Sequence, residues 1–193
     1  MSDLLYKSVS SRISLNKEEW ELSRTLFLPQ TVRKKQFLLK ESEVCLHTIF
    51  VNKGCLRSYS IDKNSEEHIT QFATEGWWIA DLSSFLTGEP SIYNIEALED
   101  SEILLLDKTS QEILFEKVPK FERYFRLLIQ SSYVALHKRL LSTITNTAEE
   151  KYLRMQKAYP DIMQRVPQHM VASYLGLKPE TLSRIRKKLS EEK

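Results

Sequence analysis

Apolar positions change their spacing along the chain, and the change separates a strand-rich part from a helical part. From residue 37 to residue 106, short runs of β-branched and aromatic residues alternate with turn residues, which predicts strands. The expected strands cover residues 37–39, 48–51, 56–61, 69–72, 92–98 and 103–106. Residues 52–54 (Asn-Lys-Gly) predict a hairpin turn between two of them, with Gly54 at a positive φ angle. Many short strands at these intervals are typical of a barrel or a sandwich.

Helical spacing flanks the strands on both sides. Asn16 and Glu19 resemble a capping box, and the helix that they start is expected to end at Pro29. Pro119 is expected to open a long helix that runs to about Asn146. On this helix a wide apolar arc is expected to cover the barrel; it consists of Phe121, Phe125, Leu128, Ile129, Leu136 and Leu140.

A second, narrower apolar stripe lies on the same long helix. Leu127, Val134 and Leu141 recur every seven residues. Such a repeat is expected when a helix also packs along a partner, but three positions equally suit an ordinary exposed face. The spacing alone leaves a dimer contact and a monomer open.

Residues 166–189 predict two short helices joined by a glycine turn. Pro167 suits the opening turn of the first helix, and Gly176 can end it in the left-handed conformation. Pro179 then starts the second helix, whose inward face is marked by Leu182, Ile185 and Leu189.

The opposite face of this second helix carries Glu180, Arg184 and Lys187 at positions i, i+4 and i+7. Arginine can hold guanine with two hydrogen bonds, a carboxylate can accept from cytosine, and lysine can contact phosphates. The same residues also suit a solvated helix with a Glu180–Arg184 surface pair. Both interpretations fit the spacing.

The segment GLKPETLSRIRKKL resembles the recognition helix of the Crp/Fnr family of bacterial transcription regulators, in which an Arg follows a Glu-Thr pair by three residues. The resemblance implies that Glu180 and Arg184 contact bases and that Thr181 contacts phosphate. We expect the DNA-binding set to be Glu180, Thr181, Arg184, Lys187, Lys188, His169 and Lys178. The family usually has Ser-Arg before Glu-Thr where this chain has Lys178-Pro179, so the operator cannot be borrowed from relatives.

Residues 76–98 resemble the phosphate-binding cassette of cyclic-nucleotide-binding barrels. Ala80, Asp81 and Leu82 stand where that family has a Gly-Glu-Leu turn, and Ser91-Ile92 stand where its cyclic-nucleotide binders place an arginine. Residues 76–107 contain no Arg or Lys, and burying a phosphate without a cation is costly. We therefore expect no binding of cyclic AMP, with Arg57 on a neighbouring strand as the substitute cation if the pocket has moved.

Composition and charge narrow the function classes. The 193 residues are 41% hydrophobic with a net charge of +2, and residues 147–193 hold ten Lys and Arg against six Asp and Glu. A basic C-terminal part on a mildly acidic body is expected if only that part meets phosphate. No signal pattern or membrane-length apolar run occurs, so we expect a cytoplasmic protein without membrane contact.

Candidate catalytic or metal groups are few. Cys45 and Cys55 are too few for an iron–sulfur cluster held by four thiolates, and the four histidines show no metal-ligand spacing. No catalytic constellation appears. We therefore expect no cofactor, no metal and no enzymatic activity. A cupin-type enzyme is the third candidate, because such barrels share the strand pattern, but the clustered His and Glu ligands that it needs for a metal are absent.

These patterns and resemblances predict an α+β chain. An antiparallel, jelly-roll, cyclic-nucleotide-binding-like β-barrel is expected over residues 1–118, a dimerisation helix over 119–146 and a helix-turn-helix, winged-helix-like domain over 147–193, with a reduced wing in 161–166. The leading function is a homodimeric regulator that binds palindromic double-stranded DNA, with a barrel that is either the sensor of an unknown small-molecule effector or the vestige of a sensor. The alternative is a small-molecule-binding module that signals through protein contacts.

Overall fold

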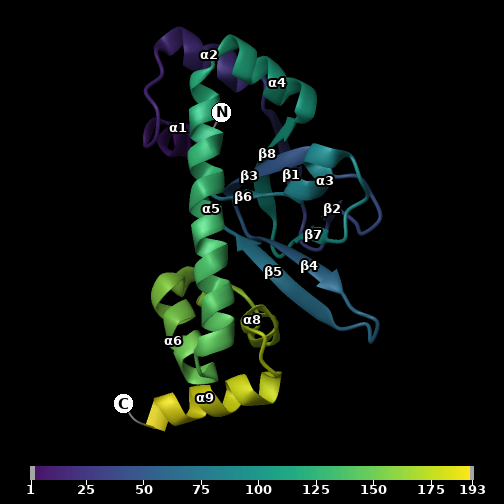
Figure 1. Cartoon of the computed structure of the whole chain (residues 1–193), viewed down its shortest axis with the longest axis vertical. Helices are drawn as coiled ribbons and strands as arrows, with labels where there is room; N and C mark the ends of the chain where they lie inside the picture. Colours follow the sequence, from purple (N-terminus) through teal and green to yellow (C-terminus); the bar gives the residue numbers. More distant parts are fainter. Residues whose placement is uncertain (1–2, 192–193) are drawn as a thin grey trace. The chain divides into compact units, whose positions relative to one another are not determined.

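The computed structural model describes residues 3–191, which form two compact units (Figure 1). The first unit comprises the chain up to Ser60 and Gln71–Ser131. The second comprises Ile61–Thr70 and the chain from Ser132 onward. Two strands and one helix therefore have residues in both units.

The helices and strands of both units, in chain order, begin with α1 (Asp3–Ser10) and α2 (Lys17–Thr25). The strands are β1 (Leu28–Val32), β2 (Phe37–Leu39), β3 (His47–Lys53), β4 (Leu56–Ile61), β5 (Glu67–Ala73), β6 (Trp78–Ile79), β7 (Asn94–Ala97) and β8 (Ser101–Asp107). The remaining helices are α3 (Leu82–Thr87), α4 (Lys108–Lys117), α5 (Lys120–Thr145), α6 (Ala148–Ala158), α7 (Pro160–Arg165), α8 (Gln168–Leu175) and α9 (Pro179–Glu191).

The strands form two four-stranded sheets, in the orders β1-β8-β3-β6 and β2-β7-β4-β5. Strand β8 explains how they pack, because its residues alternate between two cores. Ile103 and Leu105 belong to the core enclosed by the sheets, whereas Leu104 and Leu106 belong to a second core with α1, α4 and α5. The expected α+β fold with an antiparallel barrel is confirmed.

The turn after β3 differs from the expected hairpin. Gly54 has a φ angle of 108°, as predicted, but β3 and β4 belong to different sheets. The turn is therefore a corner where the chain passes from one sheet to the other. A Cβ atom at Gly54 would lie 2.1 Å from the hydroxyl oxygen of Ser101, so the corner requires glycine for space as well as for conformation.

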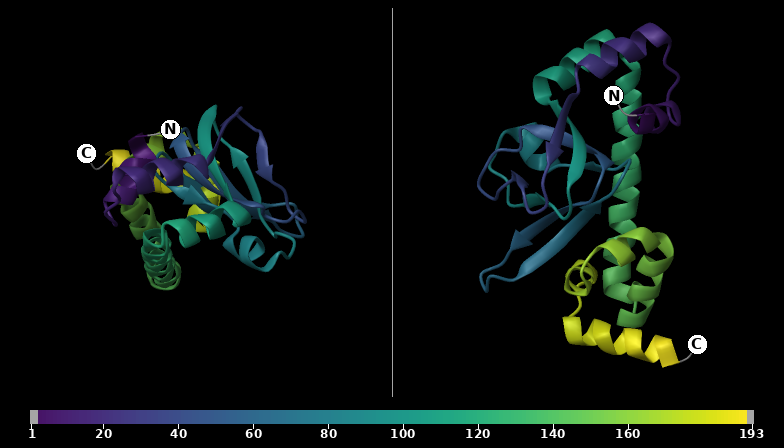
Figure 2. Two further views of the ribbon diagram at one scale, coloured as in Figure 1. Left: turned by 90° about the horizontal axis from the view of Figure 1, so that it is seen from above. Right: turned by 180° about the vertical axis from the view of Figure 1, so that it is seen from behind.

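Helix α5 is one unbroken helix, seen end-on in the left view of Figure 2. Its first turns complete the second core, where Phe121 and Tyr124 are fully buried and Leu128 packs at the edge. The expectation that the apolar arc covers the barrel over its whole length is wrong. Ile129, Leu136 and Leu140 are about half or more exposed, at 49%, 61% and 56%.

The second unit is helical after α5. Thr147 caps α6 in a capping box with Glu150, whose pKa is lowered chiefly by the hydrogen bond from the Thr147 backbone. The predicted connection with a reduced wing is wrong, because Pro160–Arg165 forms α7 with the proline in its first turn. From α5 to residue 191, the described chain contains helices and turns but no strand.

Candidate nucleic-acid interface and barrel pocket

The α8–turn–α9 segment has the geometry of two helices locked by a glycine. Gly176 ends α8 with a φ angle of 66°. Its backbone N–H donates to the Ser173 carbonyl at 3.0 Å, and the N–H of Leu177 donates to the Ala172 carbonyl at 2.9 Å. This pair of bonds is a Schellman motif, which fixes where α8 stops and so sets the start of α9.

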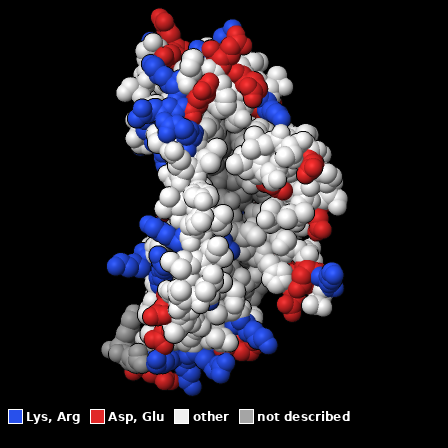
Figure 3. All heavy atoms as spheres, in the orientation of Figure 1, with Lys and Arg blue, Asp and Glu red and all other residues white. Residues whose placement is uncertain are grey.

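Helix α9 has two distinct faces. Leu182 and Ile185 are buried at 1% and 9% exposure, which holds the helix against its own unit. Glu180, Arg184 and Lys187 are all exposed on the other face, and Lys and Arg side chains gather along α9 with acidic ones beside them (Figure 3). Within residues 3–191, Arg184 forms no hydrogen bond or ion pair, so the Glu180–Arg184 surface pair considered above does not form.

The other predicted DNA-binding residues differ in their partners. Lys188 forms an ion pair with Glu149 of α6 at 2.8 Å, which ties α9 to α6. Lys187 is 80% exposed and only 3.9 Å from Glu191, an exposed contact that stabilises little. Lys178 and His169 are exposed, and Thr181 is half-buried. Among the described residues, Arg184 and Lys178 are therefore exposed cations without a side-chain partner, and Lys187 is only weakly engaged.

The residues predicted to form the barrel pocket lie around the start of α3. Asp81 caps α3 by accepting from the Ser84 N–H at 3.2 Å, and its second carboxylate oxygen accepts from the Ser91 hydroxyl at 2.7 Å. Both side chains are buried. Ala80 is half-buried, whereas Leu82 and Ile92 are exposed at 40% and 63%. The structure thus brings Asp81 and Ser91 into contact and leaves Leu82 and Ile92 exposed to solvent.

Arg57, the substitute cation, is buried and is itself paired. Its guanidinium lies 2.8 Å from the Glu96 carboxylate and 4.0 Å from the centre of the Tyr59 ring. Arg57 and Glu96 are 5% and 9% exposed. The Glu96 carboxylate therefore already neutralises the positive charge of Arg57 that an incoming phosphate would need.

The stripe predicted for dimerisation is largely exposed on α5. Leu127 is half-buried, whereas Val134 and Leu141 are 50% and 61% exposed. More large apolar side chains of this helix are exposed than the seven-residue repeat indicated: Ile129, Tyr133, Leu136, Leu140 and Ile144. A helix face this apolar is unusual unless it packs against another protein surface.

Sequence reasoning missed a set of contacts that holds α8. The Ser173 hydroxyl donates to the Glu67 carbonyl at 2.6 Å and accepts from the Ile69 N–H at 3.0 Å. Arg139 of α5 donates to the Thr70 carbonyl, and its guanidinium lies 4.2 Å from the centre of the Tyr174 ring. Burial raises the pKa of Tyr174. No sequence signal marked these residues, because each interaction joins segments that are distant along the chain.

Comparisons with known proteins find similarity in both sequence and fold. Residues 29–117 match a family model described as the cyclic nucleotide-binding domain. The regulatory protein HlyX of Actinobacillus pleuropneumoniae is 25% identical over 178 residues, which cover 86% of this chain and 72% of that protein. The fumarate and nitrate reduction regulatory protein of Vibrio cholerae is 24% identical over 186 residues, covering 89% and 73%. The fold is shared with FixK2 from Bradyrhizobium japonicum, with a TM-score of 0.73 and 20% identity over 86% of this chain and 85% of that one.

Proposed function

We propose that this chain, which belongs to the Crp/Fnr family of transcription regulators, acts as a homodimer that binds a palindromic DNA operator through α9. Regulators of this family bind DNA as dimers and are not enzymes. The observation that carries the proposal is the exposed face of α9, where Arg184 has no partner in the described chain while the opposite face is buried.

On this proposal, two side chains of α9 read bases. Arg184 is long enough to reach into a major groove and can donate two hydrogen bonds to guanine, and Glu180, one turn before it, can accept from cytosine. Thr181, Lys187, Lys178 and His169 contact the phosphate backbone, which supplies affinity without base selectivity. Lys188 contributes less, because its ammonium group is already bound to Glu149.

The division of labour along the chain follows from this assignment. We propose residues 1–118 as the effector-sensing barrel, 119–146 as the dimerisation helix and 147–193 as the DNA-binding domain. An effector of this barrel is uncharged or binds away from Asp81 and Ser91, since these two side chains satisfy each other. No helix in the described part of the chain is long and apolar enough to cross a membrane; because its target is chromosomal DNA, we place the protein in the cytoplasm.

The direct test is selection of DNA fragments followed by affinity measurement. Fragments retained by the purified protein are sequenced, and the strongest is compared with a scrambled duplex by fluorescence anisotropy at two salt concentrations. A specific regulator should prefer its selected site by about 10³-fold or more, and both affinities should fall as salt rises. Equal affinity for selected and scrambled DNA would favour the alternative, a signalling module that acts through protein contacts.

A further inference from the structure

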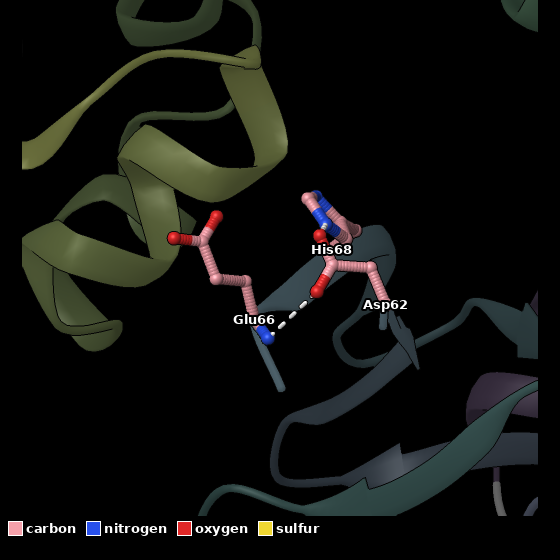
Figure 4. A group of neighbouring side chains, drawn as sticks. All are labelled: Asp62, Glu66 and His68. Carbon is pink, nitrogen blue, oxygen red and sulfur yellow. Dashed lines mark hydrogen bonds and ion pairs between the residues drawn. The ribbon is translucent and has the colours of Figure 1, made fainter. Parts of the chain in front are cut away.

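The hairpin turn between β4 and β5 gathers three metal-ligand side chains that are not adjacent in sequence. These are Asp62, Glu66 and His68, whose ligand atoms all lie within 4.8 Å of one another (Figure 4). We refer to them as the hairpin triad. Among residues 3–191, no other group of three or more His, Cys, Asp or Glu side chains comes this close together.

We propose that the hairpin triad is a binding site for a divalent transition-metal ion of the Zn²⁺ type. One imidazole and two carboxylates form a ligand set that Zn²⁺ accepts, whereas Mg²⁺ and Ca²⁺ prefer sites made of oxygen atoms alone. Three protein ligands leave the fourth tetrahedral position to water, which the exposed setting of His68 and Glu66 permits.

The turn itself holds the first ligand in place. One carboxylate oxygen of Asp62 accepts from the backbone N–H groups of Asn64 and Glu66, at 2.8 and 3.0 Å. Its other oxygen remains directed toward His68, with 2.9 Å between that oxygen and Nε2. The backbone bonds thus orient the Asp62 carboxylate, and the oxygen that faces His68 is the one available to an ion.

The distances need only a small adjustment to accept an ion. Two ligand atoms that lie about 2.0–2.1 Å from a tetrahedral Zn²⁺ are roughly 3.3 Å apart. The Asp62–His68 pair is 2.9 Å apart, and the three ligand atoms lie within 4.8 Å. Because Glu66 and His68 are exposed, side-chain rotations can close the triad around an ion without moving the core.

Glu66 distinguishes a metal site from a simple Asp–His ion pair. Its carboxylate forms no hydrogen bond or ion pair with the part of the chain that the structure describes, yet it lies beside a second carboxylate. Two neighbouring negative charges repel each other unless a cation separates them. An Asp62–His68 pair alone leaves Glu66 without a role, whereas a bound ion uses all three side chains.

The residues that follow the triad hold the first helix of the DNA-binding motif. Glu67 and Ile69 bind the Ser173 hydroxyl of α8, and Thr70 binds Arg139. An ion that fixes the hairpin tip therefore acts on the strand residues that contact α8. On this ground, which rests on the proposed function, we expect Zn²⁺ to change the affinity for the selected DNA site several-fold.

The test is calorimetric titration of the chelator-treated full chain with Zn²⁺, and separately with Mg²⁺. The wild type should bind one Zn²⁺ per chain with saturation and bind Mg²⁺ more weakly. His68→Gln and Glu66→Gln should each weaken Zn²⁺ binding by more than about tenfold, since even residues that only orient ligands contribute 10- to 100-fold. His47→Gln, which removes a histidine outside the triad, should leave binding unchanged. Circular dichroism without metal checks that each variant is folded.

Absence of saturable Zn²⁺ binding by the wild type would overturn the site, as would triad variants that bind like the wild type or a His47→Gln variant that binds equally poorly. The same proteins are then tested for DNA binding with and without Zn²⁺. A wild type that binds Zn²⁺ at the triad but keeps the same DNA affinity overturns the link to DNA. DNA selectivity in the presence of chelator tests the proposed function separately.

Discussion

The Ser91 hydroxyl donates a 2.7 Å hydrogen bond to the carboxylate of Asp81, ten residues before it in the chain. Both groups are buried, and the other carboxylate oxygen of Asp81 caps α3. A phosphate entering at this point would meet a negative charge whose hydrogen-bonding capacity is already used. The pair therefore opposes an anion in the part of the barrel that resembles a phosphate-binding cassette.

We predict from this pair that cyclic AMP and cyclic GMP do not bind. Desolvating a phosphate costs several kcal/mol unless a cation compensates, and Arg57 is committed to Glu96. Calorimetry should detect no heat of binding up to millimolar ligand. A dissociation constant in the low micromolar range for cyclic AMP that disappears in Arg57→Ala would show instead that Arg57 leaves Glu96 to hold the phosphate.

Arg184→Ala should remove selective DNA binding while the fold stays intact. The side chain is exposed and has no partner in the described chain, so its loss costs the protein little stability. Loss of a bidentate base contact should cost about 1–3 kcal/mol of binding at one base pair. Anisotropy with the selected site and with single-base variants of it measures this loss.

Lys187→Ala and Lys157→Ala serve as comparisons for Arg184→Ala. Lys187→Ala should weaken binding to all sequences and reduce the salt dependence by about one counterion. Lys157, exposed on α6 and outside the proposed interface, should be replaceable without effect. An Arg184→Ala protein with wild-type affinity and selectivity would show that α9 does not enter the groove with this face.

Gly54→Ala and Gly88→Ala should separate the two reasons for glycine at a positive φ angle. Gly88 has a φ angle of 77° and nothing within 4 Å of an added Cβ, so alanine should cost only about 1–2 kcal/mol of backbone strain. At Gly54 the same strain adds to a collision with Ser101, and overpacking costs about 1–3 kcal/mol more. Urea unfolding curves measure both, and equal midpoints for the two variants would contradict the corner geometry.

Local signals in the sequence predicted local structure well. The spacing of Leu182 and Ile185 predicted the buried face of α9, and the Asn16–Glu19 capping box is present as predicted. Gly54 was predicted to have a positive φ angle for the same reason, because turn chemistry depends on adjacent residues. The pairing of the strand before that turn depends on distant residues. Strand β3 pairs with β8 and not with β4, so the hairpin prediction was wrong.

Proline was the main source of error in the elements. Pro29 was taken as the end of a helix, but it lies in β1, an edge strand of its sheet, where a missing N–H is tolerated. Pro160 opens α7 where a connection with a reduced wing was predicted for residues 161–166.

Helical spacing could not show which apolar residues of α5 pack within the chain, because the pattern records faces and not partners. Phe121 is buried in the first unit, whereas Leu136 remains exposed. The hairpin triad escaped notice for a related reason. Asp62, Glu66 and His68 have no metal-ligand spacing on a helix or extended strand, and only the turn brings them together.

Val134→Glu should convert the protein to monomers. Val134 is 50% exposed at the middle of an apolar stretch of α5, and a carboxylate buried there against a second copy would lose its hydration without gaining a partner. Ala135→Glu is the matched control, because Ala135 is exposed and lies about 100° around the helix from Val134, on the side away from the exposed apolar residues. Sedimentation at micromolar concentration should show a dimer for the wild type and for Ala135→Glu, and a monomer for Val134→Glu with unchanged circular dichroism. Because two recognition helices about 34 Å apart are needed to bind both half-sites of a palindrome, Val134→Glu should also lose most of its affinity for the selected site. A wild type that sediments as a monomer, or a Val134→Glu protein that remains dimeric, would place the dimer contact away from this face of α5.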